Sequence, residues 1–274
     1  PFSGVEKDGF IWGRGSFDDK YQTAVFATIM KKVKESNVNL TRDIIFVATC
    51  DEEAGGENGL GFLEKNYKDE ISAGFALNEG GGAVLKLGKR KYSLIQIAEK
   101  GVAWIKLTAK SKGGHASIPP TDNPTVRIAK AVSKLSTIKS EVRISNPVKL
   151  MIEKLRGDFG LSHLPIEKVL GVKGVGSLLL SLFPYDKTKI LKAWLSNTYC
   201  PTVIHGGEKI NVVPDETSCM VDSRILPGVT REMVEEKIKK IVLPYNIDVE
   251  IIQFHEAQST EVNTPLYKTI HNVM

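Results

Sequence analysis

Residues 43–56 read DIIFVATCDEEAGG. The apolar, β-branched run from Ile44 to Cys50 predicts a buried strand, and three acids, Asp51, Glu52 and Glu53, follow it directly before a glycine-rich break. A buried carboxylate is costly unless its pKa shifts or it takes a cationic partner. Because neither Arg nor Lys occurs within seven residues of the Glu52-Glu53 pair, a metal ion is the natural partner for several carboxylates at this position.

The overall composition is that of an ordinary globular protein. The 274 residues are 42% hydrophobic and 25% charged, with a formal net charge of +5. The lysines form no basic block interleaved with aromatics, and no apolar run reaches the roughly 18 residues of a membrane span, so we expect neither a nucleic-acid nor a membrane partner. The three scattered cysteines, Cys50, Cys200 and Cys219, form no disulfide framework or zinc motif, which favours a reducing, cytoplasmic location.

The first 95 residues alternate between strand-like and helix-like segments. Strands are predicted at 10–12, 44–50 and 75–77, and helices at about 18–34 and 57–65. This rhythm is typical of a mostly parallel sheet with helices on both faces, in which ligands bind beyond the carboxyl ends of the strands. We therefore expect three loops to deliver carboxylates to one sheet edge, namely those of Asp18, Asp19, Glu52, Glu53 and Glu79.

From residue 96 the pattern changes to long alternating strands. It predicts strands at about 101–109, 199–205, 216–225 and 247–254, helices at 125–135 and 230–242, and a partly helical insertion at about 146–195. This order is that of a ferredoxin-like α+β unit. The fold class is accordingly α/β with an inserted α+β domain. We expect a catalytic domain at 1–95, an inserted domain at 96–254, and a return to the first domain at 255–274.

Six short strings carry a resemblance to a known family. They occur in order along the chain: WGRGSFDDK at 12–20, DEEAGG at 51–56, LNEGG at 77–81, GGHAS at 113–117, KINVVP at 209–214 and DSR at 222–224. Together they resemble the M20 family of zinc metallopeptidases over essentially the whole chain. With PFSG at 1–4 they look most like its carboxypeptidase-S-like and aminoacylase branch. The resemblance implies that the inserted domain is a dimerisation, or lid, domain.

The resemblance also implies a division of roles among the acids. Asp18 would bridge two zinc ions (Co²⁺ and Mn²⁺ are the alternatives), Glu53 and Glu79 would each complete one metal shell, and Glu52 would be the general base. Asp19 and Asp51 would support that site. The implied reaction is hydrolysis of an amide or peptide bond in a dipeptide or an N-acyl amino acid that carries a free carboxylate.

Three residues of the inserted domain receive roles in the same way. In the family, a histidine at the position of His115 reaches across a homodimer and stabilises the oxyanion of the partner's tetrahedral intermediate. Residues placed like Asn211 and Arg224, expected on two adjoining strands, hold the substrate backbone and its carboxylate. An arginine suits the last task because its planar fork matches a carboxylate. A homodimer through the lid domain is therefore expected.

The chain departs from the family at two metal ligands. The resemblance implies an upstream His-x-Asp motif and a histidine near the end of the catalytic domain, and neither is found. We therefore expect a fragment, whose carboxylates alone suit Mg²⁺ or Ca²⁺ better than Zn²⁺. A catalytically silent dimerisation or binding module of the same fold is the alternative function. Carboxypeptidase, aminoacylase, dipeptidase and aminopeptidase-like specificities all stay open.

Overall fold

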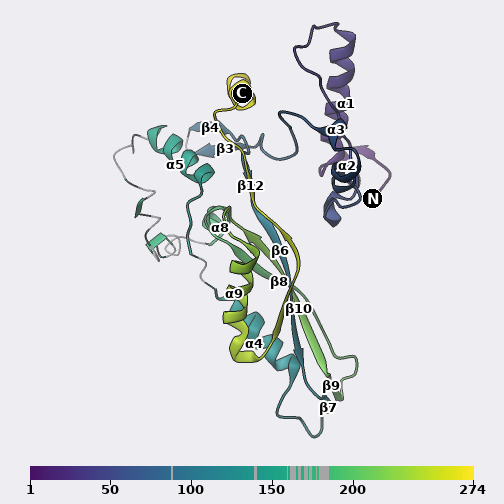
Figure 1. Cartoon of the computed structure of the whole chain (residues 1–274), viewed down its shortest axis with the longest axis vertical. Coiled ribbons are helices and arrows are strands. Elements are labelled where there is room, and N and C mark those ends of the chain that lie inside the picture. Colours follow the sequence, from purple (N-terminus) through teal and green to yellow (C-terminus); the bar gives the residue numbers. More distant parts are fainter. Residues whose placement is uncertain are drawn as a thin grey trace. The chain divides into compact units, whose positions relative to one another are not determined.

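The computed structural model divides the chain into two compact units. One consists of Pro1–Ile95 with Pro265–Met274, and the other of Gln96–Thr264. It describes residues 1–87, 89–138, 141–158, 160, 165, 168–169, 172, 175–176, 178 and 185–274. Much of the insertion expected at 146–195 lies outside these residues. The fold is mixed α/β, with helices and sheets in both units (Figure 1).

The second unit is built on one four-stranded sheet. Its strands are β6 (Gly101–Lys110), β8 (Thr198–Gly206), β10 (Glu216–Ile225) and β11 (Asp248–His255), in the spatial order β11-β6-β10-β8 with every pair antiparallel. Helices α4 (Pro124–Ser136) and α9 (Arg231–Val242) complete a β-α-β-β-α-β order, which is that of a ferredoxin-like unit. Each of these six elements lies within one residue, at each end, of the range that periodicity predicts.

The core of this unit lies between one face of the sheet and the two helices. Strand β6 alternates strictly, so that Ala103, Ile105, Leu107 and Ala109 are fully buried while their neighbours are half-buried. Helices α4 and α9 add apolar side chains at helical spacing. The members from the helices are Ile128, Ala131, Leu135, Val234, Ile238 and Val242. The opposite sheet face is therefore left for polar and charged side chains.

Leu107→Ala is expected to destabilise the protein by about 2–5 kcal/mol, because it removes a fully buried side chain from a closely packed core and leaves a cavity. Leu243→Ala is the matched control, since the Leu243 side chain is 77% exposed and its truncation is expected to change the free energy of unfolding by about 0.5 kcal/mol or less. Urea unfolding measures both. Equal effects of the two substitutions would contradict this placement of the core.

Both core helices begin at caps that the sequence encodes. The Asn123 side chain accepts hydrogen bonds from the backbone N–H groups of Thr125 and Val126, and Pro124 occupies the first turn of α4. Thr230 caps α9 by accepting from the N–H of Met233. These bonds satisfy N–H groups that the helix itself leaves without a partner. They fix where each helix starts and hence how the preceding loop approaches it.

The remaining elements of the second unit are short. A 3₁₀ turn, η2 (Leu243–Tyr245), follows α9, and strand β5 (Ala98–Glu99) pairs with β12 (Gln258–Ser259). The insertion contributes α5 (Asn146–Asp158) and α8 (Tyr185–Leu195), which share a small apolar cluster around Val148 and Leu195. The hairpin strands β7 (Gly114–His115) and β9 (Val212–Val213) are described with the site below.

The first unit consists of helices, two hairpins and connecting segments. Its opening hairpin turns at Asp8 and Gly9, whose φ values of 56° and 78° fit the left-handed pair that a tight two-residue turn requires. Its elements are β1 (Val5–Lys7), β2 (Phe10–Trp12), α1 (Lys20–Glu35), the 3₁₀ turn η1 (Glu52–Ala54), α2 (Leu60–Asn66), α3 (Lys68–Ile71), β3 (Val84–Leu87), β4 (Arg90–Ser93) and α10 (Pro265–Val273).

The parallel sheet predicted for this unit is not found among the described residues. All strand pairs there are antiparallel, and neither 44–50 nor 75–77 is a strand. Ile44 and Phe46 remain 47% and 37% exposed. The physical reason is that a strand exists only through hydrogen bonds to a neighbouring strand, and these segments make no such ladder with the residues that the structure describes. Their apolar composition therefore favours burial, but the described part of the unit does not bury them.

Within the described residues, no helix combines the length and the hydropathy needed to cross a bilayer.

Candidate active site

The acidic loop after Cys50 is organised by Asp51. Asp51 adopts a left-handed conformation, φ 70°, and its Oδ2 accepts hydrogen bonds from both the backbone N–H and the side-chain amide of Asn58, each at 3.0 Å. Its carbonyl oxygen accepts from the N–H of Gly56 at 2.7 Å. Asp51 thus closes a loop in which Glu52 and Glu53 form the exposed turn η1. Asp51 therefore has a structural role in this loop, and the two glutamates lie at the surface.

Gly59→Ala is expected to distort this loop. A Cβ at Gly59 would overlap the carbonyl oxygen of Cys50, whereas a Cβ at Gly74 would meet no atom within 4 Å. Because overlapping backbone atoms must move apart, Gly59→Ala is expected to cost about 1–3 kcal/mol in free energy of unfolding. Gly74→Ala is the control, and urea unfolding is the measurement. A loss no greater than that of the control would contradict this close approach.

Asp18 and Asp19 lie directly before helix α1. The peptide bond between them is cis, Asp18 is exposed, and Asp19 is the N-cap residue of the helix. The side chain of Asp19 makes no capping bond, and its ψ of 46° lies outside the β-region typical of caps. Instead, Asp19 Oδ1 is buried and has no hydrogen-bond partner among the described residues. A buried carboxylate oxygen is costly without a donor or a cation.

The predicted metal ligands are not brought together. Asp18, Glu53 and Glu79 are all exposed and lie in three separate segments. Across the described part of the chain, no group of three or more His, Cys, Asp or Glu side chains is placed to hold a metal ion. Zinc sites are typically tetrahedral and rich in nitrogen or sulfur ligands. These three carboxylates by themselves therefore do not make a zinc site, which would need nitrogen or sulfur ligands as well.

The second unit brings two of its three predicted site residues together. His115 in β7 pairs with Val212 in β9, and the N–H of Ala116 donates to the carbonyl oxygen of Asn211 at 2.9 Å. We call the segments 111–123 and 207–215, which meet here, the tip (Figure 1). The tip extends beyond the ends of β6 and β10. Residues 96 positions apart in sequence thereby share one exposed end of the unit.

The local hydrogen bonds of His115 define its tautomer. Its Nδ1 lies 3.2 Å from the backbone N–H of Ser117, which can only donate, and 2.6 Å from the Ser117 hydroxyl. Nδ1 is therefore the acceptor, so in a neutral imidazole the proton is on Nε2. An Nε2–H at an exposed tip is a donor of the kind that stabilises an oxyanion.

Arg224 lies elsewhere, in a charged cluster on the sheet face away from α4 and α9. Its guanidinium donates to Asp222 through Nε at 2.8 Å and Nη2 at 3.1 Å, and Asp222 also accepts from Trp104 Nε1 at 3.2 Å. Lys100 donates to carbonyl oxygens at the end of α8, those of Ala193 and Ser196. Burial lowers the pKa of Lys100 to about 8, and the Arg224 charge adds to this while Asp222 opposes it.

The expected placement of Asn211 and Arg224 on adjoining strands is wrong. Asn211 lies in the turn before β9, whereas Arg224 is near the far end of β10. Glu216, at the tip end of β10, is separated from Arg224 by about 27 Å of strand at ~3.4 Å per residue. The reason is that β10 is a long regular strand, so thirteen residues of sequence do not keep two side chains close. One copy of the second unit therefore presents two separate polar sites.

Two residues of these sites were not assigned roles from sequence. Asp222 pairs with Arg224 because residues two apart on a strand share a face, and that signal was present in the string DSR. Asn58 donates two hydrogen bonds to Asp51. In the sequence, only its position near glycines indicates that it lies in a turn. Both residues orient a proposed site residue.

Comparisons with known proteins agree with the six strings. The sequence profile of "Peptidase family M20/M25/M40" matches residues 1–274. The chain is 27% identical over 259 residues to human N-fatty-acyl-amino acid synthase/hydrolase PM20D1, covering 93% of this chain and 50% of that protein. It is 29% identical over 251 residues to probable carboxypeptidase S-like 2 of Dictyostelium discoideum, covering 88% and 47%.

A solved structure shares the fold. Human carnosine dipeptidase 1 matches with a TM-score of 0.62 at 13% identity, covering 98% of this chain and 59% of that one. The chain spans about half the length of the curated relatives it matches. Because the family profile covers residues 1–274 and the motif strings lie within that match, the resemblance is confirmed: this chain belongs to peptidase family M20/M25/M40.

Proposed function

We propose that the protein is a metal-dependent hydrolase that cleaves an amide or peptide bond in a dipeptide or an N-acyl amino acid. The observation that carries this proposal is the family match over residues 1–274, which includes both units and all six motif strings. The names of two relatives, an N-fatty-acyl-amino acid synthase/hydrolase and a probable carboxypeptidase, support amide chemistry at an amino-acid substrate. Hydrolysis of N-acyl amino acids and dipeptides by the full-length protein, followed by product chromatography, tests it.

Glu52 is the proposed general base. Its place in the exposed turn η1, directly before the glycines at 55 and 56, puts it at the surface, where a substrate can approach. A carboxylate there takes the proton of the attacking water and passes it to the leaving nitrogen. The backbone of its loop is held by Asp51 and Asn58, so the base sits on a closed turn.

Asp18, Glu53 and Glu79 are the proposed carboxylate ligands of a divalent-metal site, with zinc as the first choice and cobalt or manganese as alternatives. Such an ion acidifies a bound water and polarises a carbonyl group. Asp19 Oδ1, next to Asp18 in sequence, is buried and has no hydrogen-bond partner among the described residues, which supports a cation at this place. Zinc would need nitrogen or sulfur ligands in addition to these acids. Metal analysis of the purified full-length protein decides this point, and metal-free protein with full activity would reject it.

Arg224 is the proposed site for the free carboxylate of the substrate. Its side chain is 51% exposed and its fork is already oriented by Asp222. An oriented guanidinium binds a carboxylate through two parallel hydrogen bonds. The predicted homodimer would let this site and the tip of another copy serve one substrate, with His115 donating to the oxyanion in the partner's site.

Arg224→Ala is expected to raise KM by about 10- to 100-fold for substrates with a free carboxylate, since a hydrogen-bonded charge pair is lost. The kcat is expected to change little, because the contact is made equally in the ground state and the transition state. A substrate whose carboxylate is amidated serves as the matched control, and its KM should not respond. Steady-state kinetics on both substrates is the measurement. An unchanged KM for the free acid would refute this role.

A catalytically silent dimerisation or binding module of the same fold is the second candidate. The separation of the acids into three exposed segments favours it. Absence of hydrolysis across dipeptides and N-acyl amino acids, with dimerisation retained in analytical ultracentrifugation, would support this reading over the first.

A further inference from the structure

The segment 111–123, which carries His115, leaves strand β6 at Lys110 and enters helix α4 at Pro124. Three contacts hold it along its length. The Ser111 N–H donates to Asp215 O at 2.7 Å, and the Gly113 N–H donates to Ser111 Oγ at 3.0 Å. The third contact is the pairing of β7 with β9. These contacts lie within the tip itself. A different group connects both ends of this segment to the body of the unit.

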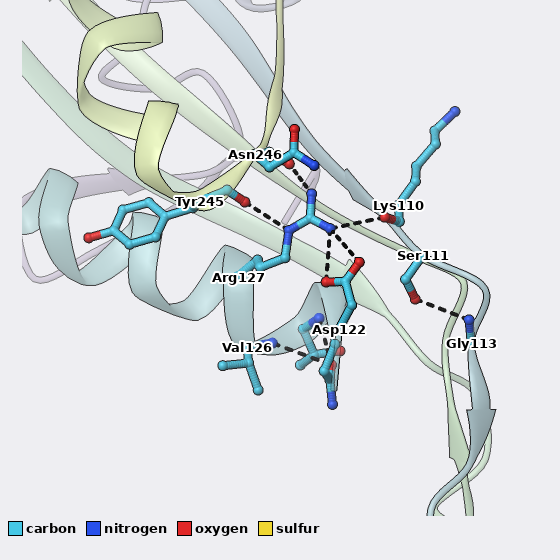
Figure 2. A network of polar contacts seen from close by, with 10 residues as sticks. Lys110, Ser111, Gly113, Asp122, Val126, Arg127, Tyr245 and Asn246 are labelled. Atoms are coloured by element: carbon cyan, nitrogen blue, oxygen red, sulfur yellow. Dashed lines mark hydrogen bonds and ion pairs between the residues drawn. The ribbon is translucent and has the colours of Figure 1, made fainter. Parts of the chain in front are cut away.

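That group is the guanidinium of Arg127 on the first turns of α4 (Figure 2). Its Nη1 donates to Lys110 O at 3.0 Å and to both carboxylate oxygens of Asp122 at 3.1 Å. Its Nε donates to Tyr245 O at 2.8 Å, and its Nη2 donates to Asn246 O. Lys110 immediately precedes the segment and Asp122 lies at its far end. One guanidinium therefore holds both ends of the His115 segment and anchors them beside β11.

The environment of Arg127 suits an arginine and no other residue. Its side chain is only 14% exposed, whereas Asp122 is 56% exposed. The carbonyl groups of Tyr245 and Asn246 end the turn η2, where helix-type hydrogen bonding leaves carbonyls without partners. A fixed planar fork satisfies these acceptors and the carboxylate at once, while the single ammonium of a lysine does not. Breaking a pair of this kind leaves a buried charge without its partner.

We propose that Arg127, acting through Asp122, is a positioning residue for His115. This inference rests on the proposed function, in which His115 Nε2 donates to an oxyanion. The Arg127–Asp122 pair sets where the His115 segment leaves strand β6 and enters helix α4, and hence where the imidazole lies at the tip. Displacing a catalytic group by about 1 Å costs about 100-fold in rate. If the pair had only a structural role, it would stabilise the unit without determining the position of His115.

Asp122→Ala is the sharpest variant, because it releases the far end of the segment and leaves the three carbonyl contacts of Arg127 in place. Hydrogen–deuterium exchange is expected to rise in residues 111–122 and to stay unchanged in β6 and β10. Asp122→Asn, which keeps a carbonyl acceptor, is expected to lie between Asp122→Ala and the wild type. Arg231→Met is the matched control, since Arg231 Nη2 donates to Ile251 O at 3.0 Å, in strand β11 and outside the segment. Unchanged exchange in 111–122 would overturn the proposal.

Kinetics of the full-length protein supply the second readout. Asp122→Ala is expected to lower kcat by about 10- to 100-fold at unchanged KM, and to lower it no further when His115→Ala is already present. Additive losses in the double variant would show that Asp122 acts independently of His115 and would overturn the proposal. If His115→Ala alone keeps full activity, the proposed role of His115 fails, and the exchange result still decides whether the Arg127–Asp122 pair holds the segment.

Discussion

Glu52→Gln in the full-length protein is expected to lower kcat for an amide substrate by about 10²–10⁴-fold, which is the usual contribution of a positioned general base. The substitution keeps the size and hydrogen-bonding shape of the side chain but removes its ability to accept a proton at neutral pH. Substrate binding and metal content should therefore remain, so that KM and metal stoichiometry serve as internal checks. Steady-state kinetics and metal analysis on the same preparation are the measurements.

The matched control for this prediction is Glu57→Gln. Glu57 is an exposed glutamate a few residues further along the same loop, and no role is assigned to it. It is expected to keep wild-type kcat, which separates a specific base from a general loss of negative charge in the loop. Glu53→Gln should differ from both, because loss of a metal ligand lowers metal content. Retained activity in Glu52→Gln would refute its role as the base.

The second unit shows how much of a fold local pattern alone can predict. Strand β6 alternates over its whole length, and α4 and α9 carry apolar stripes and N-terminal caps. These signals are all contained within the segments themselves, and the segments pack on one another to form the core. Periodicity, capping and burial therefore give the same answer, which is why the predicted bounds are accurate to a residue.

The first unit shows why the same reasoning fails elsewhere. The run from Ile44 to Cys50 is as apolar as β6, yet it forms no strand within the described residues. A buried strand of a parallel sheet needs partners on both sides and cover on both faces, none of which its own sequence encodes. The same dependence applies to the acids that follow it. Sequence identified Glu52 and Glu53 as unusual, but convergence of carboxylates is a property of several segments together.

The site in the second unit was predictable in its parts but not in its arrangement. His115 and Asn211 were identified from motif strings, and the pairing of β7 with β9 brings their segments together. Arg224 was identified from a third string, but the length of β10 places it far from the tip. Spacing in sequence cannot reveal this, because an extended strand converts few residues into a large distance. In the proposed homodimer, the tip of one copy and the Arg224 site of the other would reach one substrate.

His115→Ala is expected to lower kcat by about 10²–10³-fold, which is the typical cost of removing one donor to an oxyanion. In a homodimer whose His115 acts in the partner's site, this loss should be rescued by a second copy that carries Glu52→Gln. The mixed dimer then combines an intact Glu52 from one copy with an intact His115 from the other. Equal mixing gives hybrid dimers in about half of the population, each with one complete site, so about a quarter of wild-type activity should return.

The control for this rescue is a mixture in which both copies carry His115→Ala and one also carries Glu52→Gln, because no complete site can form from that pair. The two inactive proteins must be unfolded and refolded together, or co-expressed with different tags and purified on both, so that subunits exchange. Activity is then measured per tagged hybrid dimer. A hybrid no more active than its parents would place His115 and Glu52 of one site on the same copy. The trans arrangement is what the family resemblance implies, and the exposure of His115 at the tip of its unit is compatible with it.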